Sequence, residues 1–202
     1  MAETSLVDLR LVEQLRQDVI LRNFDVVKSQ DPGRMVIVDC ADGSRKLELL
    51  LHHYNLAQTA GDVAMDECVF HDPSLNGGGL LLHPESPLIK PHLRQHLTLL
   101  DSIEGGVHFK NLDGNGARPL ILIYAHTPCA AATAYRLNIV EQMQWIVRAK
   151  QYLKELHPNW RVLCMVHVLK SGQPSAKEKR GQYASYVFSS RAFLRWFSRF
   201  SL

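Results

Sequence analysis

Cysteine and long apolar runs are scarce in this chain, and both absences exclude classes of protein. Its 202 residues include four cysteines, too few for a disulfide-stapled scaffold of this length. The N-terminus lacks a basic stretch followed by an apolar run, the pattern of a secretory signal. The longer apolar runs, such as residues 119–124, are far below the roughly 20 residues that cross a bilayer. These absences predict a cytoplasmic protein with no membrane-spanning segment.

A strong charge of one sign is also missing. The formal net charge is +3, and the Lys and Arg residues are scattered and form no dense basic stripe, so we expect no nucleic-acid partner. With 46% hydrophobic residues, a chain of this length can bury one substantial core. We therefore expect a single domain over residues 1–202, with a helical arm over 1–30, a core over 31–172 and a C-terminal extension over 173–202.

The hydrophobic pattern alternates between strand and helix periodicity. Two short apolar runs, residues 35–38 and 120–124, have the β-branched composition of strands that are covered on both faces. The pattern further predicts helices over 5–28, 46–56, 92–103 and 130–156, strands over 62–70 and 160–169, and a long glycine-rich loop over 72–91 with at most a short strand at 80–82.

Alternating strands and helices predict an α/β fold with a mainly parallel central sheet flanked by helices. Crossovers between parallel strands are right-handed, and binding sites in such sheets gather beyond the carboxyl ends of the strands. Polar clusters follow both of the clearest strands, so we expect the functional site at that edge.

The two clusters contain a set of potential metal ligands. Cys40 follows the first strand, and His126 and Cys129 follow the second. Two thiolates and one imidazole suit tetrahedral zinc, and a site with three protein ligands leaves a fourth position for water or a carboxylate. The alternative is two buried structural cysteines and a core histidine. Cys68 and Cys164 lie within apolar strands, and we interpret both as core residues.

Around these ligands the chain resembles the β-class carbonic anhydrases, which carry Cys-x-Asp-x-Arg after one strand and His-x-x-Cys after another. Here the motifs are Cys40-x-Asp42-x-x-Arg45 and His126-x-x-Cys129. The resemblance implies the β-carbonic-anhydrase fold, a homodimer or higher homo-oligomer, zinc on Cys40, His126 and Cys129, and the interconversion of carbon dioxide and bicarbonate.

The resemblance also implies roles for Asp42 and Arg45 beside the metal. Zinc lowers the pKa of a water that it binds to about 7, and the resulting hydroxide can attack carbon dioxide. Asp42 would orient that water, and Arg45 would hold Asp42 by a bidentate ion pair. Without that ion pair, Asp42 becomes a candidate fourth zinc ligand.

Two residues, Gly43 and Ser44, separate Asp42 from Arg45, where the family has one. This departure leaves alternatives open: a catalytically silent zinc-binding scaffold, or a hydrolase of a carbon dioxide analogue such as carbonyl sulfide or carbon disulfide. Asp42 and Arg45 themselves can instead form a loop salt bridge or cap a helix that begins near residue 46.

Two further groups of residues invite a functional interpretation. His52, His53, His71 and His83 can shuttle protons from the metal site, although histidines on helices and loops are more often simply solvated. Residues 190–202 predict an amphipathic helix with arginines on one face and aromatic side chains on another. Such a helix can bind a membrane surface or a partner. We favour packing on its own domain or on a sister subunit, with the N-terminal helix supplying an apolar surface.

Overall fold

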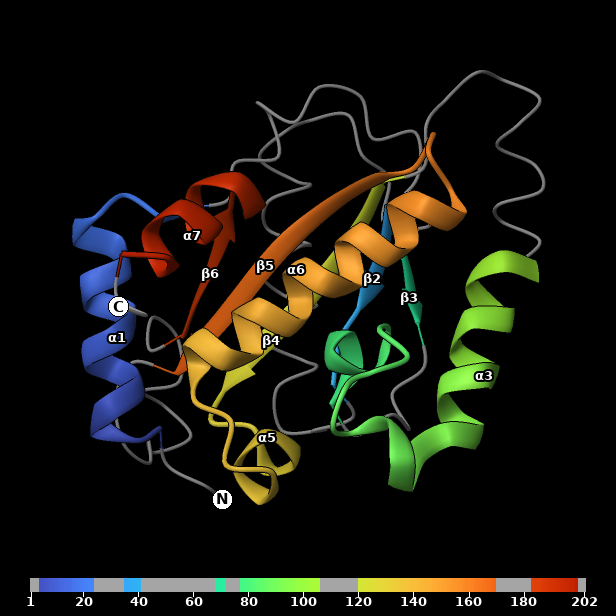
Figure 1. The fold of residues 1–202 in the computed structure, drawn as a ribbon, viewed down its shortest axis with the longest axis horizontal. Helices are drawn as coiled ribbons and strands as arrows, with labels where there is room; N and C mark the ends of the chain where they lie inside the picture. The colour runs from blue at the N-terminus through green and yellow to red at the C-terminus, as the bar shows by residue number, and fades with distance from the viewer. Residues whose placement is uncertain are drawn as a thin grey trace.

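The computed structural model describes residues 4–23, 35–40, 68–71, 77–105, 120–169 and 183–199. Within these ranges the strands form one six-stranded mixed sheet in the order β1-β6-β5-β4-β2-β3, with helices packed against it (Figure 1). The strands are β1 (Leu21–Asn23), β2 (Met35–Val38), β3 (Cys68–His71), β4 (Leu120–Thr127), β5 (Arg161–Leu169) and β6 (Tyr183–Phe188). The expected α/β class and its central sheet are confirmed.

The middle of the sheet is parallel. Strands β3, β2, β4 and β5 run in one direction, and β4 is buried along its whole length, as its continuous apolar sequence predicts. Strand β6 pairs antiparallel with β5, and β1 pairs antiparallel with β6. Sequence analysis missed both of these strands. They come from the segments assigned to the arm and the extension, so both segments supply part of the sheet.

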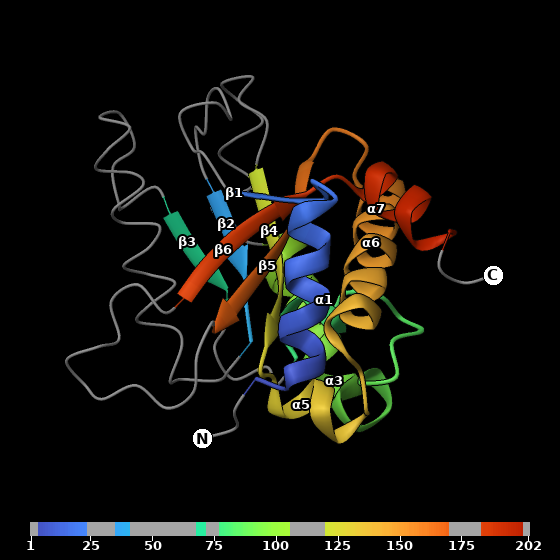
Figure 2. The same ribbon diagram turned by 90° about the vertical axis from the view of Figure 1, so that its left-hand side faces the viewer.

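The helices of the described residues are α1 (Leu6–Gln17), the 3₁₀ helix η3 (Gly78–Leu81), α3 (Ile89–Gly105), α5 (Ala130–Ala134), α6 (Ile139–Leu156) and α7 (Ser190–Phe197). Helix α6 crosses β4 and β5 (Figure 1), and it lies on the same side of the sheet as α7 (Figure 2). Its buried side chains, including Met143 and Ile146, join a core with Ile121, Ile123 and Val166 of the strands.

Two expected helices are shorter than predicted. The helix expected over 130–156 is split into α5 and α6, because Arg136 has a φ of 56° and Asn138 starts a new helix with a capping box to Glu141. The helix expected over 5–28 ends at Gln17. Val19 follows with a φ of 58°, a left-handed conformation that redirects the chain into β1.

The glycine-rich loop also differs from the expectation. Residues 80–82, which sequence analysis allowed as a short strand, belong instead to η3 and its C-cap. Helix α3 covers the expected 92–103 helix and starts three residues earlier, with a non-helical backbone at His92. The expected helix over 46–56 and residues 62–67 of the expected second strand lie outside the described residues.

The C-terminal helix α7 packs on its own domain, as favoured from its sequence. Phe193 and Trp196 are buried, and Phe193 contacts Phe188 of β6 edge to face. The Trp196 indole donates a hydrogen bond of 2.6 Å to the Asp18 carboxylate at the end of α1. Among the described residues, no helix has the length and apolar composition needed to cross a bilayer.

Candidate metal centre

The winding of the parallel sheet reverses between β2 and β4. The chain passes from β2 to β3 on one side and then returns to place β4 on the other side of β2. Where the winding of an open parallel sheet reverses in this way, the carboxyl ends of the two strands diverge and form a binding crevice. Cys40 lies two residues beyond β2, and His126 is the penultimate residue of β4. The candidate ligands are therefore at this reversal point.

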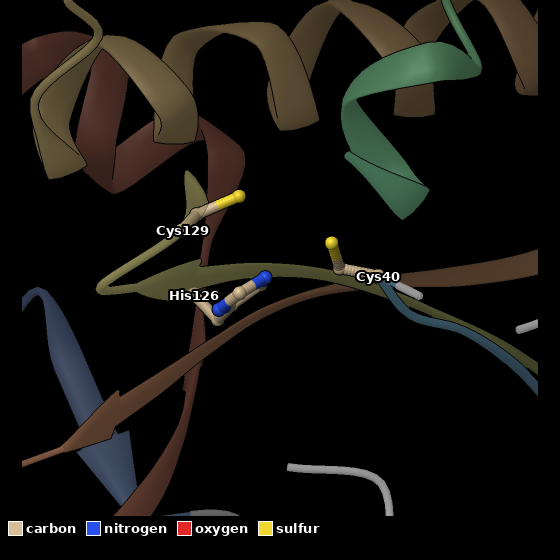
Figure 3. A group of neighbouring side chains, drawn as sticks. All are labelled: Cys40, His126 and Cys129. Atoms are coloured by element: carbon tan, nitrogen blue, oxygen red, sulfur yellow. The ribbon is translucent and has the colours of Figure 1, made fainter. Parts of the chain in front are cut away.

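The three candidate ligands meet there and are buried. One ligand atom from each of Cys40, His126 and Cys129 lies within 4.8 Å of the others. The two sulfur atoms lie on one side of the β4 ribbon, and the imidazole approaches them from the other (Figure 3). Residues from two strand ends and the following turn thus form one group that can hold a metal ion.

Local backbone structure fixes the turn between His126 and Cys129. The Thr127–Pro128 peptide bond is cis, and Cys129 then occupies the N-cap of α5 with an extended backbone. Its sulfur accepts the Ala132 amide N–H at 3.5 Å. This amide is one of the N–H groups left without a partner at the start of a helix, so the same turn orients Cys129 and caps α5.

The pKa values of the two thiols shift in opposite directions. The hydrogen bond from Cys129, together with the hydrogen bond and charge of His126, lowers the pKa of Cys40 to about 4, although burial opposes this change. The same hydrogen bond to Cys40, reinforced by burial, raises the pKa of Cys129 well above its usual range. The contact between the two cysteines therefore favours the thiolate at Cys40 and the thiol at Cys129.

This donor set fits zinc. Zinc–sulfur bonds of about 2.3 Å and zinc–nitrogen bonds of about 2.0 Å at tetrahedral angles separate the ligand atoms by about 3.5 to 3.8 Å. The atoms of the three side chains already lie within 4.8 Å of one another, so small side-chain rotations bring them onto one ion. A bound metal would also displace the Cys129 proton, because only a thiolate coordinates.

The glycine-rich loop lies directly against Cys40. The Gly77 amide donates a hydrogen bond of 3.1 Å to the Cys40 sulfur. A Cβ at Gly78 would lie 2.3 Å from the Asp39 carbonyl and 2.5 Å from the Cys40 nitrogen, and the φ of Gly78 is +43°. Only glycine allows this close approach. The sequence predicted a long glycine-rich loop here but did not indicate its contact with Cys40.

Buried polar side chains extend from the site along one face of the sheet. His167 lies beside His126 in the register of β4 and β5, and its Nδ1 is 2.9 Å from the Ser185 hydroxyl. Tyr124 is also buried on this face, and its burial raises the pKa of its phenol. Sequence analysis missed these residues. The alternation of side chains along β4 could have indicated Tyr124 and His126. They are two residues apart in an otherwise apolar strand, so their side chains lie on the same face of the sheet.

Several candidate residues lie away from this group or outside the described ranges. Asp42, Arg45, His52 and His53 are outside them, as are the side chains of His71 and Cys68. His83 follows η3, and its ring makes a tilted contact with Trp145 and an edge-to-face contact with Tyr152, each with a ring-centroid distance of 5.8 Å. Partial burial lowers its pKa. Cys164 is buried within β5, in agreement with its interpretation as a core residue.

Comparisons of the whole chain with known proteins give no match. No protein-family model, no curated protein and no solved structure matches the sequence or its fold. The functional assignment therefore depends on the chemistry of Cys40, His126 and Cys129 and on the resemblance of the two motifs that contain them.

Proposed function

We propose that this protein is a zinc enzyme that interconverts carbon dioxide and bicarbonate. The observation that carries the proposal is the convergence of Cys40, His126 and Cys129 at the reversal point of the sheet, with their ligand atoms within 4.8 Å. The residues come from the two motifs that resemble those of the β-class carbonic anhydrases. Substrate turnover, zinc and a homodimeric assembly are parts of the same proposal.

The number of ligands favours a catalytic over a structural site. Structural zinc sites are closed by four protein ligands, whereas catalytic sites keep one position for water or substrate. Within the described part of the chain, the group contains three donor residues. Bound zinc would supply a strong nucleophile at neutral pH, because it lowers the pKa of a coordinated water to about 7.

The chain's own residues would orient and tune the ligands. The Gly77 amide binds the Cys40 sulfur, and the Ala132 amide binds the Cys129 sulfur. Hydrogen bonds of this kind fix the ligand atoms and withdraw negative charge from them, which strengthens the metal as a Lewis acid. In the proposal, Asp42 accepts a hydrogen bond from the attacking water, and Arg45 keeps Asp42 ionised and off the metal.

The direct test is stopped-flow hydration of carbon dioxide by protein of measured zinc content, between about pH 7 and pH 9, where a zinc-bound water ionises. We expect a rate that is proportional to zinc content and rises with pH. Zinc-loaded protein without this activity would contradict the proposal. Turnover of carbonyl sulfide or carbon disulfide by that protein would then identify the analogue hydrolase, and no turnover the silent scaffold.

Replacing Arg45 separates metal binding from catalysis. In Arg45→Ala we expect full zinc content and hydration slowed by about 100-fold, because misplacement of a reacting group costs this much. The matched control is Arg16→Ala, which removes an exposed arginine whose partner is Glu13 on α1 and should leave the rate unchanged. Equal rates in the two variants would remove Arg45 from the mechanism.

A further inference from the structure

A carboxylate from the N-terminal helix reaches the segment that contains Cys129. Asp8 lies in the first turn of α1 and is buried, with 9% of its surface exposed. Its Oδ2 accepts a hydrogen bond of 2.9 Å from the Thr127 hydroxyl. Its Oδ1 accepts a hydrogen bond of 2.8 Å from the Ile139 amide. One side chain thus joins two points that are 119 and 131 residues away in sequence.

The two partners of Asp8 bracket the metal-binding segment. Thr127 follows His126 directly and precedes Cys129 by two residues, and Ile139 is the first residue of α6. Between them lie Cys129, helix α5 and the turn that splits α5 from α6. Because both oxygens of one rigid carboxylate are engaged, the two ends of this segment are held at a fixed separation, and the position of Cys129 relative to His126 is fixed with them.

The chemistry of Asp8 is matched to this position. A buried carboxylate is costly unless hydrogen bonds compensate it, and here each oxygen has a donor. The Ile139 amide is one of the N–H groups that a helix leaves unpaired at its start, and negative charge is favourable at that end of α6. Val12 and Leu15 of α1 are buried in the main core, which anchors the helix that contains Asp8.

We propose that Asp8 is a positioning residue for the metal centre, which makes α1 part of the site. Asp8 acts through Thr127 and Ile139 and does not touch the metal. This inference rests on zinc binding by Cys40, His126 and Cys129 as proposed above, but it does not depend on carbon dioxide hydration. The prediction for zinc affinity and the prediction for hydration activity can therefore be contradicted independently.

The test compares Asp8→Asn with Asp18→Asn. Asparagine keeps the size of Asp8 but presents an NH₂ group to one of the two donors. The Asp18 variant alters another long-range carboxylate hydrogen bond of α1, the one to Trp196, away from the metal-binding segment. By chelator competition we expect Asp8→Asn to raise the zinc Kd by about 10- to 100-fold, as for other outer-sphere changes. Asp18→Asn should leave the Kd unchanged.

Variants of Thr127 supply a milder second test. Thr127→Val removes the donor and keeps the shape, so it should raise the zinc Kd in the same direction and shift the thiolate-to-metal absorption of the cobalt-substituted protein. Thr127→Ser restores the hydroxyl and should restore both. Wild-type zinc affinity in Asp8→Asn and Thr127→Val would overturn the inference. A wild-type protein that binds no zinc would overturn it together with the proposed function, whereas zinc binding without hydration would overturn only the latter.

Discussion

Two regions of the same sheet contain buried cysteines with opposite properties. Cys164 lies in the middle of β5 under α6, where burial raises the pKa of its thiol. Cys40 lies at the carboxyl edge, where the hydrogen bond from Cys129 and the contact with His126 lower its pKa to about 4. All three cysteines have 5% or less of their surface exposed. Burial alone therefore does not decide in which direction the pKa of a cysteine shifts.

The difference comes from the polar partners available in each region. Inside the sheet, the N–H groups of β4, β5 and β6 are paired in the ladder. The Cys164 sulfur instead contacts the Ser190 hydroxyl at 3.5 Å and the Ile146 carbonyl. Beyond the strand ends the ladder stops. The amides of Gly77 and Ala132 are then free to donate to sulfur. The pKa of Cys40 is lowered mainly by its hydrogen bond with Cys129 and by His126, and the Gly77 amide acts in the same direction.

The most severe test of this comparison replaces one cysteine from each region. Cys129→Ser removes a first-sphere ligand, so we expect the zinc Kd to rise by more than about 100-fold, beyond the range of outer-sphere changes. Cys164→Ser should bind one zinc per chain with wild-type affinity, and its free energy of unfolding should fall by about 1 kcal/mol, as for an average point mutation. Metal analysis and chelator competition measure both. Unchanged zinc content in Cys129→Ser would refute the ligand assignment.

A second test replaces the glycine that touches the backbone of Cys40. In Gly78→Ala the new methyl group meets the Asp39 carbonyl, which cannot move without Cys40, so we expect the zinc Kd to rise by at least about tenfold. Leu153→Ala is the control, because this residue is buried in the core at the far end of α6. It should cost about 2 to 5 kcal/mol of stability with zinc affinity unchanged. If both variants lost zinc affinity equally, the effect of Gly78→Ala would come from reduced global stability and not from its contact with the Cys40 backbone.

A third test uses the raised pKa of Cys129. The pKa of Cys129 is raised well above its usual range, so a metal must displace the proton of this thiol. Zinc binding should therefore release at least one proton, and the zinc affinity should fall by at least about tenfold for each pH unit below neutrality. Calorimetry in buffers of different ionisation enthalpy counts these protons. The Cys164→Ser variant should give the same count. Zinc binding without proton release would contradict the raised pKa of Cys129.

Local patterns predicted the elements that position the ligands. The apolar runs of β2 and β4 and the polar residues that follow them were sufficient to place Cys40, His126 and Cys129 at one edge of a parallel sheet, because strand direction fixes where the ends meet. The break at Asn138 was also visible in principle. Its side chain and Glu141 form a capping box, a pattern that the continuous hydrophobic periodicity of residues 130–156 concealed.

The remaining features depend on contacts between distant residues. Strand β1 has three residues, and it forms by pairing with β6. Pairing between such distant segments leaves no local pattern in the sequence, so neither strand was predicted. Asp8 occupies an ordinary position in the first turn of a helix, and only folding brings it to Thr127. The tight approach of Gly78 to Cys40 is likewise a tertiary contact, which composition cannot distinguish from a flexible loop.

The most direct test of the metal centre is X-ray absorption at the zinc edge on purified, zinc-loaded protein. We expect two sulfur ligands at about 2.3 Å and nitrogen or oxygen ligands at about 2.0 to 2.1 Å, in a four-coordinate site. The Cys129→Ser variant should lose one sulfur and Cys164→Ser none. A first shell without sulfur, or protein that retains no zinc, would contradict the assignment of Cys40, His126 and Cys129 as a metal centre.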